Sequence, residues 1–170
     1  MLIGNYFENL NLRYNNHYFS GLSFNSLKCK KDNIFFSIRG NENDGNKFIK
    51  EAIKNGARTV VSNLKYQGFK DKILFINSSN VRKLLAKTAF LVYWPRPKNL
   101  IAVTGTNGKS SIADFYFQIL KLNKKKVASI GTLGIKTAFS KSTVINTTLD
   151  PIELGKTLVK LKKKKIENVI

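Results

Sequence analysis

The sequence predicts an α/β fold in two parts: a small N-terminal domain with a mixed sheet, then the first part of a parallel-sheet domain of the P-loop type. Three observations support this prediction. Short apolar runs alternate with amphipathic runs along most of the chain. Pro95 and Pro97 interrupt the pattern and mark a boundary. Beyond them, a glycine-containing loop joins an apolar run to a helical run. We therefore expect domains at 1–94 and 99–170, with a linker at 95–98.

Composition bounds the class of protein. The 170 residues are 42% hydrophobic and 11% aromatic, which is enough for packed cores and too much for a disordered chain. Cys29 is the only cysteine and His17 the only histidine, so an internal disulfide and a multi-histidine metal or catalytic cluster are excluded. No apolar run is long enough to span a membrane, and the first residues do not resemble a signal peptide. We expect a cytoplasmic protein.

The formal net charge is +20. Such a charge is typical of proteins that bind nucleic acid or an anionic surface. The basic residues, however, are nearly all lysine, with only five arginines, and arginine is the stronger sign of phosphate or base recognition. We interpret the charge as a solvated lysine-rich surface and expect no specific nucleic acid and no membrane as partners.

The first domain shows the expected alternation of strands and helices. Apolar and β-branched runs predict strands at residues 21–27, 33–38, 58–62 and 72–77. A helix is expected at 47–55, ended by Gly56. Ser79 is expected to cap a second helix, whose apolar face carries Val81, Leu84, Leu85, Ala89 and Val92.

The central motif lies at residues 100–111. An apolar run, 100–103, predicts a strand; a loop from Gly105 to Gly108 follows; a helix is expected at 109–122, with Ile112, Phe115, Tyr116, Ile119 and Leu120 apolar. Glycines allow close backbone approach to a ligand, and the free amides of a first helical turn attract anions. Lys109 is suited to a β- or γ-phosphate and Ser110 to Mg²⁺. The general P-loop motif has glycine five positions before Gly108, where this chain has Val103, so the generic motif is only partly met.

The remaining residues continue the alternation. Strands are expected at 127–130 and 143–146. Asp150, Pro151 and Glu153 form a strong helix start, in which the aspartate caps and the proline takes the first helical position. The helix ends in lysines 162–165, which suit the negative end of its dipole, and 166–170 reads as a further strand.

The loop Thr104-Gly-Thr-Asn-Gly-Lys-Ser-Ser111 resembles the ATP loop of the Mur ligase family, most closely in its tripeptide synthetase branch. A second segment, Gly40-Asn-Glu-Asn-Asp-Gly-Asn-Lys-Phe-Ile-Lys-Glu-Ala-Ile-Lys-Asn-Gly-Ala57, is similar to a signature of the family's first domain. The resemblance implies a UDP-substrate-binding N-terminal domain and the truncated start of a central ATPase domain. In the family signature Asp-Ser-Arg, this chain has Asn25-Ser26-Leu27 and so lacks the arginine charge.

The resemblance also implies roles for particular residues. ATP would be bound by Gly105, Thr106, Asn107, Gly108, Lys109, Ser110 and Ser111, with Lys109 catalytic and Ser110 on Mg²⁺. The UDP-muramoyl peptide would contact Phe24, Ser26, Asn41, Glu42, Asn43, Asn146, Thr147 and Thr148. Simpler roles stay open: Ser26 as the end of a strand, and residues 146–148 as a cap and turn before the Asp150 helix.

The implied reaction is ligation of an amino acid to UDP-N-acetylmuramoyl-L-alanyl-D-glutamate, with ATP activating the terminal carboxylate as an acyl phosphate. The family's ATP domain continues beyond the point that corresponds to Ile170, and a third domain binds the amino acid. We therefore expect the 170-residue chain alone to be inactive in ligation. The alternatives are a folylpolyglutamate synthetase-like ligase, a basic nucleic-acid-binding protein, and a non-catalytic binding module for a nucleotide or UDP-sugar.

Overall fold

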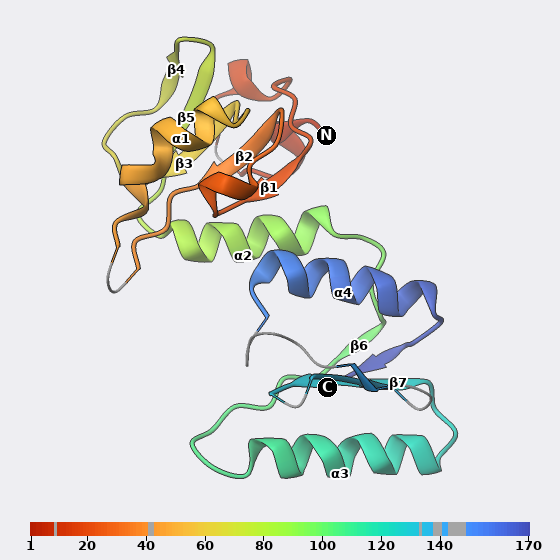
Figure 1. Ribbon diagram of the computed structural model, residues 1–170. Helices are drawn as coiled ribbons and strands as arrows, with labels where there is room; N and C mark the ends of the chain where they lie inside the picture. The colour runs from red at the N-terminus through yellow and green to blue at the C-terminus, as the bar shows by residue number, and fades with distance from the viewer. Residues whose placement is uncertain (9, 41–42, 133, 138–140, 143–148) are drawn as a thin grey trace. The chain divides into compact units, whose positions relative to one another are not determined.

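A computed structural model describes residues 1–8, 10–40, 43–132, 134–137, 141–142 and 149–170 (Figure 1). The chain forms two compact units, Met1–Val92 (unit 1) and Tyr93–Ile170 (unit 2). Among the described residues, no helix is both long and apolar enough to cross a membrane.

Unit 1 contains a five-stranded mixed sheet in the order β1-β2-β3-β5-β4. The parallel strands are β1 (Gly21–Ser23), β2 (Asn33–Phe36), β3 (Thr59–Ser62) and β5 (Ile73–Asn77). Strand β4 (Gly68–Lys70) pairs antiparallel with β5 and forms one edge. Every residue of β2 and β3 is buried, as expected for central strands covered on both faces.

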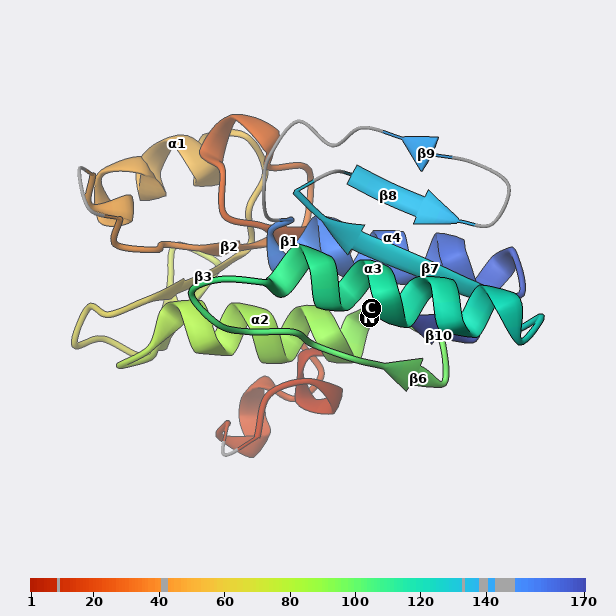
Figure 2. The ribbon, with the colours of Figure 1, turned by 90° about the horizontal axis from the view of Figure 1, so that it is seen from below.

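Two α-helices lie on opposite sides of this sheet (Figure 2). Helix α1 (Ile49–Lys54) packs Ile49, Ala52 and Ile53 against Phe35 and Val60. Helix α2 (Val81–Val92) buries Val81, Leu85, Thr88 and Ala89. Short 3₁₀ helices fill the connections: η1 (Ile3–Asn5), η2 (Leu12–Tyr14), η3 (Ser26–Lys28) and η4 (Gly45–Phe48).

Unit 2 contains a second sheet in the order β6-β10-β7-β8-β9. Strands β6 (Asn99–Leu100), β10 (Asn168–Val169) and β7 (Val127–Gly131) are parallel, whereas β8 (Gly134–Thr137) and β9 (Lys141–Ser142) continue the sheet antiparallel. Helices α3 (Lys109–Leu122) and α4 (Pro151–Lys163) lie on opposite faces (Figure 1).

The fold class expected from the sequence is confirmed, but several local expectations are corrected. The side chain that caps α2 is Asn80, whose Oδ1 accepts from the Lys83 amide at 2.9 Å, and not Ser79. Strand β4 and the β8–β9 pair were not expected. The strand expected at 143–146 lies outside the described residues.

The packing of α3 also differs from the simplest interpretation of its pattern. Of the apolar residues expected on this helix, Ile112, Phe115, Tyr116 and Ile119 are 43–63% exposed. The helix instead packs through Phe117, supported by Ala113 and Leu120, against Val127 and Ile170. The helix carries two apolar stripes, and helical periodicity alone does not say which one faces the sheet.

Candidate phosphate-binding site

The glycine loop joins the carboxyl end of β6 to the first turn of α3. Gly105 has φ 141° and Gly108 has φ 76°, both in the region that disfavours side chains, so the loop requires glycine at these positions. Gly108 is the N-cap of α3, and it offers no capping side chain to the first helical turn. The amides at the start of α3 are therefore left to other acceptors, as in an anion site at a helix N-terminus.

Lys109 closes back over the loop. Its Nζ donates to the carbonyl oxygen of Gly105 and, at 3.1 Å, to that of Thr106. The side chain is exposed, so the ammonium group stands at the surface of the loop rather than in the core. This arrangement holds the loop in shape and leaves a cation beside the helix N-terminus.

These residues fit a polyphosphate. The loop brings together three features that each favour negative charge. These are the left-handed Gly108, the first turn of α3 without a capping side chain, and the Lys109 ammonium group. Thr106, Asn107, Ser110 and Ser111 are exposed around it and supply amide and hydroxyl groups.

A pocket of about 450 Å³ adjoins the loop within unit 2. It lies at the carboxyl ends of the parallel strands, where ligands bind in open α/β sheets. Its walls are mainly apolar side chains of the β6 segment, β7, β10 and α4. Lys109 is the one charged side chain among its described lining residues, and Ser110 lies beside it. The pocket is thus charged only where it meets the loop, and Thr132 after β7 adds a further hydroxyl group to its lining.

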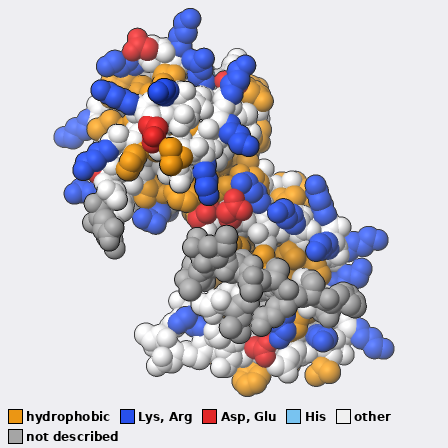
Figure 3. Space-filling model, viewed as in Figure 1, with side chains coloured by type: hydrophobic (Ala, Val, Ile, Leu, Met, Phe, Trp, Pro, Cys, Tyr) orange, Lys and Arg blue, Asp and Glu red, His pale blue; other side chains and the backbone are white. Residues whose placement is uncertain are grey.

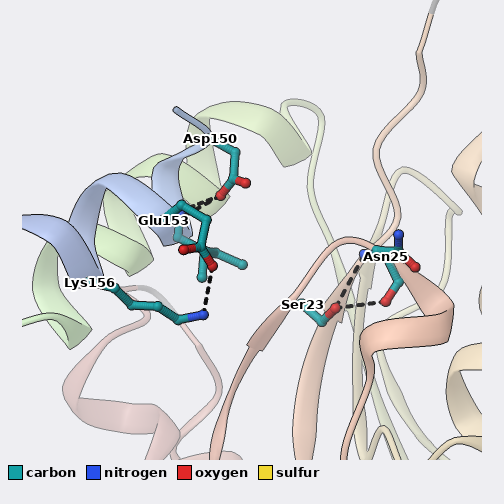
Figure 4. A network of polar contacts seen from close by, with 6 residues as sticks. Ser23, Asn25, Asp150, Glu153 and Lys156 are labelled. Atoms are coloured by element: carbon teal, nitrogen blue, oxygen red, sulfur yellow. Dashed lines mark hydrogen bonds and ion pairs between the residues drawn. The ribbon is translucent and has the colours of Figure 1, made fainter. Parts of the chain in front are cut away.

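Helix α4 forms another wall of this pocket through Leu154 and Leu158. Its start is fixed as the sequence indicates: Asp150 Oδ1 accepts from the amides of Ile152 at 2.9 Å and Glu153 at 3.0 Å (Figure 4). Glu153 in turn pairs with Lys156 at 2.8 Å. The cap therefore positions one side of the pocket.

In unit 1, Ser26 lies at the start of η3 and is 6% exposed. Its hydroxyl donates to Glu51 on α1, and its carbonyl accepts from Asn55 at 3.0 Å. The Asn25 side chain caps η3 by accepting from the Leu27 amide at 2.9 Å. The backbone N–H of Asn25 donates to the Ser23 hydroxyl oxygen (Figure 4). Asn25 thus makes the capping bond that an aspartate would make. Leu27, in place of the family's arginine, is 74% exposed.

A polar chain at the carboxyl ends of β2 and β3 was not found from the sequence. The Ser37 hydroxyl donates to Asn46 at 2.7 Å, and Asn46 donates to Asn63 at 2.8 Å. Asn46 lies within the Gly40–Ala57 signature segment, but Ser37 and Asn63 lie outside it, and only the parallel sheet brings the three residues to one edge. The backbone amide of Asn46 also donates to Asp44 Oδ1 at 3.0 Å, and this link to Asp44 adds the three residues to the candidate substrate residues.

The other expected substrate residues divide into described and undescribed positions. Phe24 is 40% exposed just after β1, and the Asn43 carbonyl accepts from the Gly40 amide at 2.8 Å. Asn41, Glu42, Asn146, Thr147 and Thr148 lie outside the described residues.

The fold and loop define unit 2 as an α/β domain with a glycine–lysine loop at the start of α3, and comparison with known proteins shows which proteins it is similar to. The model of the Mur ligase middle domain matches residues 103–170. The UDP-N-acetylmuramoyl-L-alanyl-D-glutamate–2,6-diaminopimelate ligase of Rickettsia prowazekii (strain Madrid E) is 41% identical over 164 residues, which are 94% of this chain and 34% of that protein.

Solved structures show the same fold. A UDP-N-acetylmuramoyl-L-alanyl-D-glutamate–2,6-diaminopimelate ligase superposes with a TM-score of 0.75 and 23% identity, over 94% of this chain and 33% of that one. The MurF ligase from Thermotoga maritima in complex with ADP superposes with a TM-score of 0.51 and 24% identity. This match covers 87% of this chain and 30% of that one. Residues 103–170 thus match the Mur ligase middle domain, the relatives of the chain are Mur ligases, and the chain spans about a third of the length of the curated relatives it matches.

Proposed function

We propose that this chain is the part of an ATP-dependent ligase that binds ATP and the UDP-linked substrate, in cytoplasmic peptidoglycan precursor synthesis. The full reaction joins an amino acid to UDP-N-acetylmuramoyl-L-alanyl-D-glutamate, and the names of the relatives favour 2,6-diaminopimelate as that amino acid. The observation that carries the proposal is the glycine–lysine loop on the uncapped start of α3, in a chain whose relatives are such ligases.

ATP would be held by residues 105–111. When bound, it supplies the phosphoryl group that activates the substrate carboxylate as an acyl phosphate. The amides at the start of α3 and the Lys109 ammonium bind and orient phosphate oxygens and offset their charge, and Ser110 offers its hydroxyl to Mg²⁺. The solved MurF structure holds ADP, which supports a nucleotide on this fold.

Residues 1–94 would form the UDP-substrate domain, 95–98 the linker and 99–170 the start of the ATP domain. In unit 1, Phe24, Ser26 and Asn43, with Asn41 and Glu42, are the proposed contacts to the uridine diphosphate. Asn146, Thr147 and Thr148 are the proposed contacts to the muramoyl peptide.

The test is Mg²⁺–ATP binding to the chain by calorimetry, with Lys109→Ala as the variant and Lys121→Ala, on the same helix, as the control. Loss of a charge-assisted bond to phosphate costs about 2 kcal/mol, so Lys109→Ala should weaken binding about 30-fold. Lys121→Ala should bind ATP like the unaltered chain. Equal affinity of all three proteins would overturn the ATP site.

A second titration tests the substrate. UDP-N-acetylmuramoyl-L-alanyl-D-glutamate should bind, and a folate should not. Binding of the folate alone would replace the peptidoglycan assignment with the folylpolyglutamate synthetase-like one. In the complete ligase, Lys109→Ala should abolish ATP turnover.

A further inference from the structure

Lysines gather at the edge of unit 2 opposite the glycine loop. Residues 121–126 and 160–167, which form the end of α3, the end of α4 and the turns after them, contain nine lysines and a single carboxylate, Glu167. Lys98, just before β6, adds a tenth cation. We call these ten residues the lysine edge. Figure 3 shows lysine and arginine side chains gathered on the right of unit 2, where α4 ends in Figure 1.

Hydrogen bonds hold these segments together. The amide of Asn168 donates to the Lys126 carbonyl at 3.2 Å, and the Asn99 amide donates to the Glu167 carbonyl at 2.9 Å. The Lys98 amide donates to Glu167 Oε2 at 3.3 Å. All three segments therefore meet at the amino ends of β6, β10 and β7, and their charges form one surface.

The charge on this surface is not balanced from within. Glu167 is already paired with Lys162 at 2.5 Å, and this hydrogen bond is the first cause that lowers the pKa of the Glu167 carboxyl. The lysines at 121, 124–126, 160 and 163–165 are exposed. Like charges crowded on short turns repel one another, so an external anionic partner would relieve this repulsion.

Two of the lysines occupy positions that disfavour them. Lys124 (φ 56°) and Lys165 (φ 61°) follow the last residues of α3 and α4 in the left-handed conformation, where helices usually have glycine or asparagine. Placing lysine at both sites adds charge at a cost in backbone free energy. The same conformation occurs at Asp32, Asp71 and Lys72 in unit 1, so what Lys124 and Lys165 add to the lysine edge is their charge.

Apolar side chains stand beside these cations. Leu122 is 80% exposed and Ile119, one turn earlier on the same face of α3, is 56% exposed. A face that combines lysines with exposed aliphatic residues is typical of segments that lie on anionic lipid. We propose that the lysine edge, with Ile119 and Leu122, binds the surface of an anionic lipid bilayer.

The composition of the surface favours lipid over nucleic acid. Its cations are lysines, which act as point charges and lack the planar fork that suits phosphate and base recognition. Residues 121–126 and 160–167 contain no aromatic side chain on which a base could stack. Aliphatic side chains gain from the headgroup–acyl boundary and gain little from a sugar–phosphate backbone. This proposal is independent of the ligase assignment and differs from the expectation of no membrane partner, which rested on composition alone.

The experiment is co-sedimentation of the 170-residue chain with phosphatidylcholine vesicles, with and without about one third phosphatidylglycerol. The test variant is Lys124→Asn, Lys125→Gln, Lys164→Gln and Lys165→Asn, which puts asparagine at both left-handed positions. The control variant is Lys50→Gln, Lys54→Gln, Lys65→Gln and Lys70→Gln, four exposed lysines of unit 1. Both variants lose the same charge. Circular dichroism and ATP binding check that each remains folded.

We expect the unaltered chain to bind the anionic vesicles only, more weakly as salt rises. Each lysine near the surface contributes about fivefold, so loss of four lysines should reduce the partition of the test variant on the order of 600-fold, and the control variant should lose much less. Leu122→Ser should reduce partition by several-fold. Equal loss in the two quadruple variants, or no vesicle binding at all, overturns the proposal. A parallel measurement of binding to duplex RNA gives a further outcome. If the test variant still binds vesicles but no longer binds duplex RNA, the proposal is also overturned.

Discussion

Individual residues show where sequence reasoning identifies a position but not its contacts. Ser26 was marked by a motif, yet its bond to Glu51 joins residues 25 positions apart, and no local pattern encodes that pairing. The polar chain Ser37–Asn46–Asn63 is likewise assembled by the sheet. By contrast, the glycines of the loop before α3 were identifiable because backbone conformation is a local property.

The Ser26–Glu51 bond provides a test of stability. Ser26 is buried, so Glu51→Ala should leave its hydroxyl without this acceptor and lower the free energy of unfolding by about 1 kcal/mol. Urea unfolding followed by circular dichroism measures the change. Lys50→Ala, the neighbouring exposed position on α1, serves as the control and should change stability little. A loss no larger than that of the control would mean that the bond contributes nothing to stability.

His17 should make stability depend on pH. Burial lowers the pKa of its imidazole below the ordinary value near 6.5, and Nε2 is buried without a partner among the described residues. As pH falls through about 6.5, the unfolded chain takes up this proton more readily than the folded chain, so stability present above that pH is lost. Urea midpoints between pH 7.5 and about 5.5 should fall for the unaltered chain, and less for His17→Gln. Parallel slopes for the two proteins would contradict this role.

Single elements were predictable to the extent that caps and breakers define them. The bounds of α3, Lys109–Leu122, match the sequence expectation, and α4 begins after its expected aspartate cap. The buried face of α3 was not predictable, because packing in the whole domain selects between its two apolar stripes. Strand β4 was missed because three residues, of which only one is buried, give too short a pattern.

The cap of α4 should contribute measurably to stability. Asp150→Ala removes acceptors for the Ile152 and Glu153 amides and should cost about 1 kcal/mol. The side chain of Asp150→Asn can still accept these bonds, so this variant should lose only about a few tenths of a kcal/mol of stability. Thermal unfolding of the two variants side by side gives the comparison. Equal destabilisation would indicate that charge rather than the hydrogen bonds carries the effect.

Gly155 on α4 is required by a neighbouring ring. A Cβ added there would lie closer than 3.0 Å to three carbon atoms of Tyr93. Gly155→Ala should therefore destabilise unit 2 by about 1–3 kcal/mol, although alanine is the better helix former. In the Tyr93→Ala background the same substitution should become neutral or stabilising, since the clash is gone. A double-mutant cycle on unfolding free energies measures this coupling. Additive effects would show that the ring does not restrict position 155.

For the whole molecule, the two units are separate in their secondary structure. Each sheet draws all its described strands from one unit, and β2 and β3 have every residue buried within unit 1. The sequence indicated such a division through Pro95 and Pro97, because neither proline can lie inside a helix without breaking it. The strands that complete each sheet come from positions distant in sequence, so their order required the structure.

This separation predicts that unit 1 folds without unit 2. A chain of 92 residues is large enough for an independent hydrophobic core, and the cluster of Phe35, Ala52, Val60 and Ile73 lies wholly within residues 1–92. We expect a 1–92 protein to unfold cooperatively in urea and to reproduce the amide NMR shifts that these residues have in the full chain. Because its five strands pair only with one another, removal of residues 93–170 leaves all their described ladder bonds intact. A 1–92 protein with collapsed amide dispersion would mean that the core of unit 1 needs unit 2 to form, and the two units would then be one cooperative structure.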